Sequence, residues 1–327
     1  MLDLDLPAYR PPRALRGGHR QTVLPSLFRR VGGVEYTRER LELADGDFLD
    51  LDWSRGPRPA PLAVVAHGLE GSSDRAYVRG LTRALRRRGW DVLAWNLRGC
   101  SGEPNRLLRT YHSGASDDLT PVVQHALAGG YREVAVVGFS LGGNVTLKWL
   151  GEQGGDVDSR VVAGVGVSVP VDLAGSARVM ESASRRVYMT RFLRSLAGKV
   201  TEKAERFPDA LDTSGVGRMR TFAEFDGRFT APLHGFADAE DYWRRSSSLP
   251  LLGEIRVPTL LLNALDDPFL SASCYPTEAA RKNPDLHLVT PRWGGHVGFM
   301  ARGGEFWSET VVGRFLDAAR ALRRDRA

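Results

Sequence analysis

Ser140 lies between two glycines in the segment "VVGFSLGGNV", where an apolar run gives way to a pattern with helical spacing. Gly-x-Ser-x-Gly between a strand and a helix is typical of a nucleophile elbow, a sharp turn that exposes the serine hydroxyl. Side chains two positions before and after the serine would collide in such a turn, which accounts for Gly138 and Gly142. The five-residue pattern alone is a weak signal, and the strand before it and the helix after it make it strong. We therefore predict that Ser140 is a nucleophile.

A serine hydroxyl keeps its proton at neutral pH, so Ser140 needs a general base and a carboxylate that orients the base. After a nucleophile elbow these follow in the chain order Asp or Glu, then His. Asp266 and Asp267 come directly after the apolar run in "TLLLNALDDPFL", and His296 lies in a glycine-flanked loop after the next apolar run. This order predicts His296 as the base. Either aspartate can be its partner on these grounds.

The other histidines fit the role of base less well. We expect His67, at the start of the "HGLEG" turn, to position the backbone there. The remaining ones fall in the N-terminal arm, a helix pattern, a strand pattern, or segments expected at the surface or in an insertion: His19, His125, His287, His112 and His234. No cluster of His, Cys, Asp and Glu has the spacing of metal ligands, and the predicted chemistry requires no cofactor.

Two backbone amides are candidates for an oxyanion hole. Leu141 follows Ser140 at the start of the predicted helix, where an N–H group points out of the helix toward a developing negative charge. Leu69 lies in the glycine-containing turn of "VVAHGLEGSS", after an apolar run, and its amide is the expected second donor.

The elements that must position these residues alternate between apolar strands and helix patterns. The strands are almost wholly apolar, which indicates that both faces of their sheet are buried, and the alternation predicts a mainly parallel, doubly wound α/β fold. A β-hairpin with its turn at Asp45-Gly46 should come before them. The expected strands lie in 61–71, 90–99, 132–140, 160–173, 257–267 and 285–296, and the expected helices in 76–89, 117–130, 141–155 and 305–325.

The alternation stops in one long segment, which divides the chain. We expect an irregular N-terminal arm at 1–33, a core at 34–172 and 251–327, and an insertion at 173–250, a name kept below for those residues. The insertion begins with amphipathic helix patterns, continues as an aromatic and irregular stretch, and should lie at the edge of the site as a cap. Its large apolar side chains could line an acyl pocket or form the insertion's own core: Met180, Tyr188, Met189, Phe192, Phe222, Phe225, Phe229 and Phe236.

Composition narrows the class of protein. The chain has 327 residues, a formal net charge of +6 and two cysteines that are not spaced for metal binding or redox chemistry. Its arginines are interleaved with acidic residues, which predicts a solvated surface and no nucleic-acid partner. No signal peptide precedes the first strand, and no apolar run approaches the roughly 18 residues that a membrane span needs. We expect a cytoplasmic protein without stable membrane insertion, and the sequence carries no signal for an oligomeric state.

Several motifs together resemble the YheT-type branch of the α/β-hydrolases, a branch that includes ABHD1/ABHD3-like proteins and yeast medium-chain ethyl-ester proteins. They include "HGLEGSS", "GFSLGGNVTLKWLGE", "VPTLLLNALDDPFL" and "GGHVGF", and the resemblance runs from "GGHRQT" in the arm nearly to the C-terminus. The resemblance implies a Ser–Asp–His triad of Ser140, Asp267 and His296, because the family pattern keeps Asp in the second place of the Asp pair. Trp243 departs from the pattern, which usually has tyrosine there, and puts the local packing in doubt.

The resemblance also implies a function. Such a protein would be a serine hydrolase that cleaves carboxylic esters, either short- to medium-chain acyl esters or lipid-like esters, through an acyl-enzyme. An acyltransferase or thioesterase with the same three residues is an alternative. A non-catalytic binding protein of the same fold is a second alternative. The presence of all three triad residues disfavours it.

Overall fold

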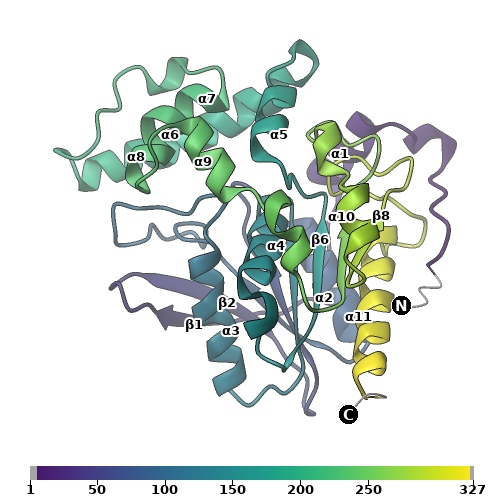
Figure 1. The fold of residues 1–327 in the computed structure, drawn as a ribbon. Helices are drawn as coiled ribbons and strands as arrows, with labels where there is room; N and C mark the ends of the chain where they lie inside the picture. Colours follow the sequence, from purple (N-terminus) through teal and green to yellow (C-terminus); the bar gives the residue numbers. More distant parts are fainter. Residues whose placement is uncertain (1–5, 325–327) are drawn as a thin grey trace.

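A computed structural model of the chain describes residues 6–324, and within them eight strands form a single sheet (Figure 1). The sheet order is β1-β2-β4-β3-β5-β6-β7-β8. β1 and β2 form an antiparallel hairpin, β2 pairs antiparallel with β4, and the strands from β4 to β8 are parallel. The predicted mainly parallel α/β fold with an N-terminal hairpin is confirmed. The strands are Thr37–Glu42, Phe48–Ser54, Leu62–Ala66, Asp91–Trp95, Val134–Phe139, Val161–Val167, Thr259–Leu262 and Leu286–Val289.

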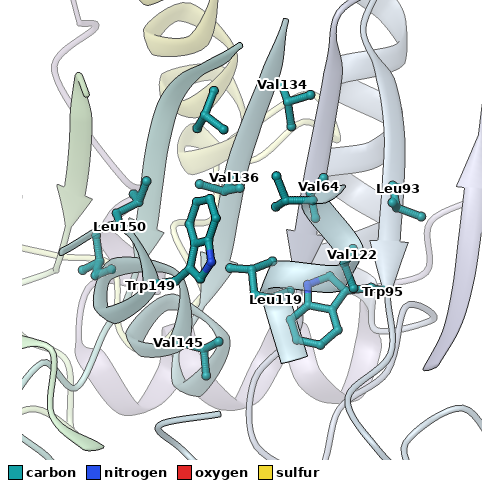
Figure 2. Packing of buried hydrophobic residues seen from close by; sticks show 14 of the residues in the cluster. Val64, Leu93, Trp95, Leu119, Val122, Val134, Val136, Val145, Trp149 and Leu150 are labelled. Carbon is teal, nitrogen blue, oxygen red and sulfur yellow. The ribbon is translucent and has the colours of Figure 1, made fainter. Parts of the chain in front are cut away.

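Helices cover both faces of the sheet, which explains why its strands are apolar throughout. α2 (Ala76–Arg87) and α11 (Trp307–Arg324) pack on one face, and α3 (Leu119–Ala128) and α4 (Leu141–Gln153) pack on the other. Figure 2 shows the second layer, where Trp149 of α4 and Val122 of α3 lie against the sheet. Neighbouring residues of a strand point to opposite faces, so Val64 belongs to this layer and Val65 to the layer under α2 and α11.

The insertion leaves the sheet after β6 and returns before β7. Its helices gather at one end of the molecule, beyond the sheet, and form two small apolar clusters of their own (Figure 1). They are α5 (Leu173–Met180), α6 (Arg186–Arg206), α7 (Phe222–Phe225), the π-helix η6 (Asp226–Thr230), α8 (Ala231–Leu233) and α9 (Ala239–Ser246).

The aromatic half of the insertion is helical, so the prediction that it is irregular was wrong. Local capping explains the short helices there. The Thr221 hydroxyl accepts a hydrogen bond from the Glu224 amide, and the Glu224 carboxylate accepts one from the Thr221 amide, which is a capping box at the start of α7. The Asp238 carboxylate accepts from the Asp241 amide and starts α9 in the same manner.

The N-terminal arm also contains a helix that we did not predict, α1 (Gly18–Phe28). Its glycine and its internal Pro25 make it a weak helix by composition, and contacts with the rest of the chain stabilise it. Gln21 is fully buried, and its Oε1 accepts hydrogen bonds from Tyr9 Oη (2.8 Å) and from the Met300 amide (2.9 Å). Residues 1–5 of the predicted arm and residue 325 of the predicted last helix lie outside the described residues. The short helix α10 (Thr277–Lys282) was not predicted either.

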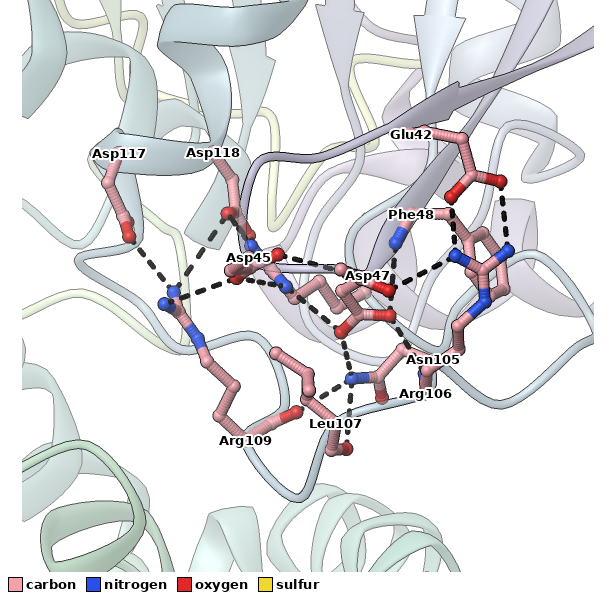
Figure 3. Close-up of polar contacts among 12 residues, drawn as sticks. Glu42, Asp45, Asp47, Phe48, Asn105, Arg106, Leu107, Arg109, Asp117 and Asp118 are labelled. Carbon is pink, nitrogen blue, oxygen red and sulfur yellow. Dashed lines mark hydrogen bonds and ion pairs between the residues drawn. The ribbon is translucent and has the colours of Figure 1, made fainter.

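A buried network of charges joins the hairpin to the core (Figure 3). The Arg98 guanidinium lies 2.9 Å from Asp45, 2.9 Å from Asp47 and 2.7 Å from Asp118, so it connects the hairpin turn to the start of α3. Asn105 donates a hydrogen bond of 2.6 Å to Asp47 and fixes the loop after β4 to the same network. The buried carboxylates of Asp47 and Asp118 are thereby paired with a cation, which offsets the cost of removing them from water.

Within residues 6–324, no helix combines the length and the apolar character needed to cross a membrane.

Candidate active site

Ser140 lies in a strained turn between β5 and α4. Its backbone angles are φ 52° and ψ −120°, a region that favours glycine and is found for other residues mainly at functional sites. Both flanking positions require glycine, but the reason differs from the predicted collision between side chains at these two positions. A side chain at either position would collide with backbone atoms. A Cβ at Gly138 would lie 2.2 Å from the Gly142 carbonyl oxygen, and a Cβ at Gly142 would lie 2.3 Å from the His67 carbonyl oxygen at the end of β3.

The three side chains predicted from the sequence meet at the carboxyl end of the sheet. His296 Nε2 lies 2.8 Å from Ser140 Oγ, and His296 Nδ1 lies 2.9 Å and 3.1 Å from the two carboxylate oxygens of Asp267. His296 and Asp267 are buried, whereas Ser140 is partly exposed. The ring therefore bridges a carboxylate and a hydroxyl, the geometry in which an imidazole can take a proton from serine.

The neighbouring Asp266 has a different place in the same loop. Its Oδ1 accepts a hydrogen bond of 2.9 Å from the Gly295 amide, one residue before His296, whereas the carboxylate that bonds the His296 ring is that of Asp267. Burial, partly offset by the Gly295 hydrogen bond, raises the pKa of its carboxyl, and the nearby Asp267 charge raises it further. The structure thus places Asp267 against the imidazole and Asp266 against the backbone that carries it.

Contacts from the N-terminal helix support the His296 loop. Thr22 Oγ1 of α1 accepts a hydrogen bond of 2.9 Å from the His296 amide. Gly18 lies so close to this region that a Cβ there would be 1.8 Å from the Asp266 carbonyl oxygen. The Phe269 ring packs on the imidazole with centroids 4.3 Å apart. Reasoning from the sequence missed this role of the arm, although the family resemblance begins within it, at "GGHRQT".

The two residues predicted as oxyanion donors, Leu69 and Leu141, line the same cavity as Ser140. Leu141 is the first residue of α4, and the first amides of a helix have no acceptor within it. The loop of Leu69 packs on the elbow, since a Cβ at Gly68 would lie 3.1 Å from Ser140 Cβ. Tyr hydroxyls accept hydrogen bonds from the amides on both sides of Leu69, Tyr77 from Gly68 (3.0 Å) and Tyr111 from Glu70 (2.9 Å). Among the described residues, the Leu69 amide donates no hydrogen bond to another protein group.

His67 fixes this loop, as the sequence predicted. It is fully buried, its Nε2 accepts a hydrogen bond of 3.2 Å from the Leu97 amide, and its Nδ1 lies 2.8 Å from the Gly68 carbonyl oxygen. Burial lowers the pKa of His67 to about 4, so the ring is neutral at pH 7 and can both accept and donate these bonds.

A mostly apolar cavity extends from Ser140 and His296 into the insertion, with a volume of about 1080 Å³ including its open mouth. Five of the large apolar residues predicted for an acyl pocket line it: Met180, Phe192, Phe222, Phe225 and Phe229. The other three, Tyr188, Met189 and Phe236, pack in the insertion's own clusters. His112 also lines the cavity, which corrects its expected place at the surface or in the insertion.

Comparison with known proteins places this geometry in a family. The family model described as "alpha/beta hydrolase fold" matches residues 61–302. The Escherichia coli (strain K12) protein named "Putative esterase YheT" is 40% identical over 321 residues, which cover 94% of this chain and 92% of that protein. The chain belongs to the α/β-hydrolase fold family, in its YheT-type branch.

Two further relatives are more distant. "Phospholipase ABHD3" of Mus musculus is 30% identical over 291 residues, covering 86% of this hydrolase and 70% of that protein. Among solved structures, the Pyrococcus furiosus esterase Pf2001 superposes with a TM-score of 0.59 at 18% identity, covering 89% of this chain and 95% of that one. At that identity the superposition supports the fold alone.

The insertion of this hydrolase is attached directly to the loop of Leu69. Lys199 Nζ of α6 lies 3.0 Å from the Glu70 carboxylate, which also accepts hydrogen bonds from Tyr111 Oη (2.6 Å) and from Ser195 Oγ of α6. Lys199 Nζ is in addition 2.9 Å from the buried Cys100 thiol. Lys199 therefore connects Cys100 to Glu70, the residue after Leu69.

In the part of the hydrolase that the structure describes, no group of three or more His, Cys, Asp or Glu side chains is placed to hold a metal ion.

Proposed function

We propose that this protein is a carboxylic ester hydrolase in which Ser140 is the nucleophile, His296 the general base and Asp267 the carboxylate that orients the base. The observation that carries the proposal is the continuous series of contacts from Asp267 through both nitrogens of His296 to Ser140 Oγ. Ser140 also lies in a strained turn at the N-terminus of α4, the position in which this fold holds a nucleophile.

Acylation would begin when His296 Nε2 takes the hydroxyl proton as Ser140 Oγ attacks the ester carbonyl. Asp267 stabilises the imidazolium that forms and keeps the tautomer in which Nδ1 carries a proton. The amides of Leu69 and Leu141 stabilise the negative oxygen of the tetrahedral intermediate, and the loss of one such donor typically costs about 2.7–4 kcal/mol of barrier. His296 then gives the proton to the departing alcohol. In deacylation His296 takes a proton from water as the water attacks the acyl-enzyme, and it returns that proton to Ser140 Oγ when the acid leaves.

The substrate is proposed to be an ester of an apolar acyl chain, of short to medium length or from a lipid. The cavity supports this, because its wall beside Ser140 and His296 is built from large apolar side chains. The names of the relatives, an esterase and a phospholipase, agree with the same class of bond. In this proposal the insertion acts as a cap that encloses the acyl chain and limits the access of water.

Hydrolysis of p-nitrophenyl esters from acetate to palmitate, by wild type and Ser140→Ala, tests the proposal. We expect wild-type activity with an optimum in chain length, and its loss in the variant by at least about a thousandfold. A fluorophosphonate probe should label Ser140 covalently and leave the variant unlabelled. If folded wild-type protein neither turned over any ester nor reacted with the probe, the hydrolase proposal would fail and a binding role would replace it.

A further inference from the structure

Asp226 is a carboxylate in the wall of the cavity that contains Ser140. It lies in the insertion, on the π-helix η6, and lines the cavity together with Thr230 of the same helix and Trp243 of α9. Asp226 Oδ1 accepts a hydrogen bond of 2.7 Å from Thr230 Oγ1, and Oδ2 accepts one of 2.8 Å from Trp243 Nε1. Trp243, which departs from the family pattern, thus finds a partner for its indole N–H at this carboxylate.

The carboxylate has no positively charged partner among residues 6–324. The ion pairs of the described chain include none with Asp226, and Arg228 of the same helix pairs with Asp212. A carboxylate removed from water is unfavourable unless it is paired or fully hydrogen-bonded. An ionised carboxylate can accept about four hydrogen bonds, and Asp226 receives side-chain bonds from two donors. Burial raises the pKa of this carboxyl to about 6, so at pH 7 it is largely ionised.

The backbone at Asp226 also departs from regular helix. Residues Asp226–Thr230 form a π-helix, a rare element that occurs mostly as a local irregularity and frequently at functional sites. Around the carboxylate, the cavity wall is aromatic and aliphatic, with Phe225, Phe229 and Tyr242 close in sequence to it or to Trp243. The cavity wall is mostly apolar, its polar members include Lys199 and His112, and among the described residues that line it Asp226 supplies the carboxylate. A few placed polar groups in a mostly apolar wall are the arrangement by which a pocket selects a polar group on an apolar ligand.

We propose that Asp226 is a specificity-determining residue, which binds a hydrogen-bond donor, a hydroxyl or an amino group, on the substrate chain at a distance from the ester. The inference rests on the proposed function, because it assigns the substrate of the same cavity. Ester hydrolysis at Ser140 positions one end of the chain, and the contact with Asp226 selects chains that carry the donor. Chains of equal length without a donor leave the carboxylate unpaired and bind less well.

Matched p-nitrophenyl esters of unsubstituted, ω-hydroxy and ω-amino fatty acids of equal length test this proposal across a series of chain lengths. For wild type we expect kcat/KM to favour one of the substituted series by about tenfold or more, since hydrogen bonds to charged groups are strong. The preference should appear at the chain length that reaches Asp226 and be absent for shorter chains. The two substituted series distinguish a neutral hydroxyl from a cationic ammonium as the preferred donor.

Asp226→Leu should remove this preference and keep hydrolysis of the unsubstituted esters, and Asp226→Asn should weaken it. Asp209→Asn, an exposed carboxylate change elsewhere in the insertion, is the matched control and should keep the wild-type ratio. Thermal unfolding checks that each variant is folded. If wild type cleaved unsubstituted esters through Ser140 and showed no preference at any length, this inference would be wrong and the proposed function would stand. If wild type cleaved none of the esters, this inference would be wrong, and labelling of Ser140 by the fluorophosphonate probe would decide separately whether the proposed function also fails.

Discussion

The backbone amide of His296 donates a hydrogen bond of 2.9 Å to the side-chain oxygen of Thr22, 274 positions earlier in the chain. The N-terminal helix α1 therefore holds the loop of the proposed general base, although it lies outside the matched family segment 61–302. The contact makes the arm part of the support of the site. Gly18, in the same helix, allows the close approach to Asp266 that brings α1 there.

Replacing Thr22 with Val should lower kcat on p-nitrophenyl esters by about two- to thirteenfold, since the lost hydrogen bond that fixes the loop is worth about 0.5–1.5 kcal/mol. KM should change little, because Thr22 does not line the cavity. Thr22→Ser retains the acceptor and should keep most of the activity. An equal loss in both variants would show that the hydroxyl oxygen does not matter.

The two neighbouring aspartates should respond differently to substitution. Asp267→Asn removes the charge that stabilises the His296 cation, and we expect kcat to fall by about 10⁴. Asp266→Asn keeps an acceptor for the Gly295 amide, so we expect a loss of less than about tenfold. Steady-state kinetics of the two purified variants provide the comparison. A larger loss for Asp266→Asn would reverse the assignment.

Gly142→Ala should be severely destabilising, because the new methyl group would overlap the His67 carbonyl oxygen and the end of β3. We expect a loss of roughly 3 kcal/mol or more in the free energy of unfolding, at the upper end of overpacking effects. Gly155→Ala is the control, since a Cβ there meets nothing within 4 Å. Urea unfolding of both variants measures the difference, and similar midpoints would contradict the close packing of the elbow.

Removing the Arg98 guanidinium should lower the free energy of unfolding by more than the loss of a surface ion pair does. Arg98→Met leaves Asp47 and Asp118 buried without their cation, and the expected loss is about 3–5 kcal/mol. Asp117→Asn, at an exposed carboxylate that pairs with Arg109, should cost less than about 1 kcal/mol. Chemical denaturation at pH 7 tests both values. Equal effects would mean that the buried charges contribute no more than the exposed pair.

The neighbouring rings of His112 and His234 should make the protein less stable in mild acid. Burial, and then the His234 ring 4.5 Å away, lower the pKa of His112 to about 3. Between pH 6.5 and 3 the unfolded chain therefore binds the proton more readily than the folded protein. The free energy of unfolding decreases as the pH is lowered through this range, by up to about 1.4 kcal/mol per pH unit.

His112→Phe removes this proton-binding site, so its free energy of unfolding should depend less steeply on pH between 7 and 5 than that of the wild type. Urea unfolding at several pH values compares the two slopes, which makes any constant effect of the substitution on stability irrelevant. Parallel curves would show that His112 titrates alike in both states.

Much of the core could be predicted because its signals are local. Each buried strand is a short apolar run, and the elbow requires glycine at positions where any Cβ meets backbone. The choice between Asp266 and Asp267 was different. Both follow the same strand, and only the path of the backbone after β7 decides which carboxylate faces the imidazole.

The elements that were missed depend on contacts far along the chain. α1 contains Gly18 and Pro25, and its stability comes from residues such as Met300 and His296 that no local pattern reveals. The short helices α7 and α9 begin at single capping residues inside an aromatic stretch, where periodicity is too brief to detect. The place of Asp226 in the cavity wall likewise depends on the packing of η6 against α9, which the sequence pattern does not reveal.

The pairing of β6 with β7 has a consequence for the newly made chain. Gly164 lies opposite Thr259, so these strands can pair only after the whole insertion has left the ribosome. Ser140 and Leu69 precede that point, whereas Asp267 and His296 follow it. Domains are synthesised at about 5–20 residues per second, so for several seconds the nascent chain carries its proposed nucleophile without its base. We expect the nascent protein to stay inert toward esters until its last strands dock.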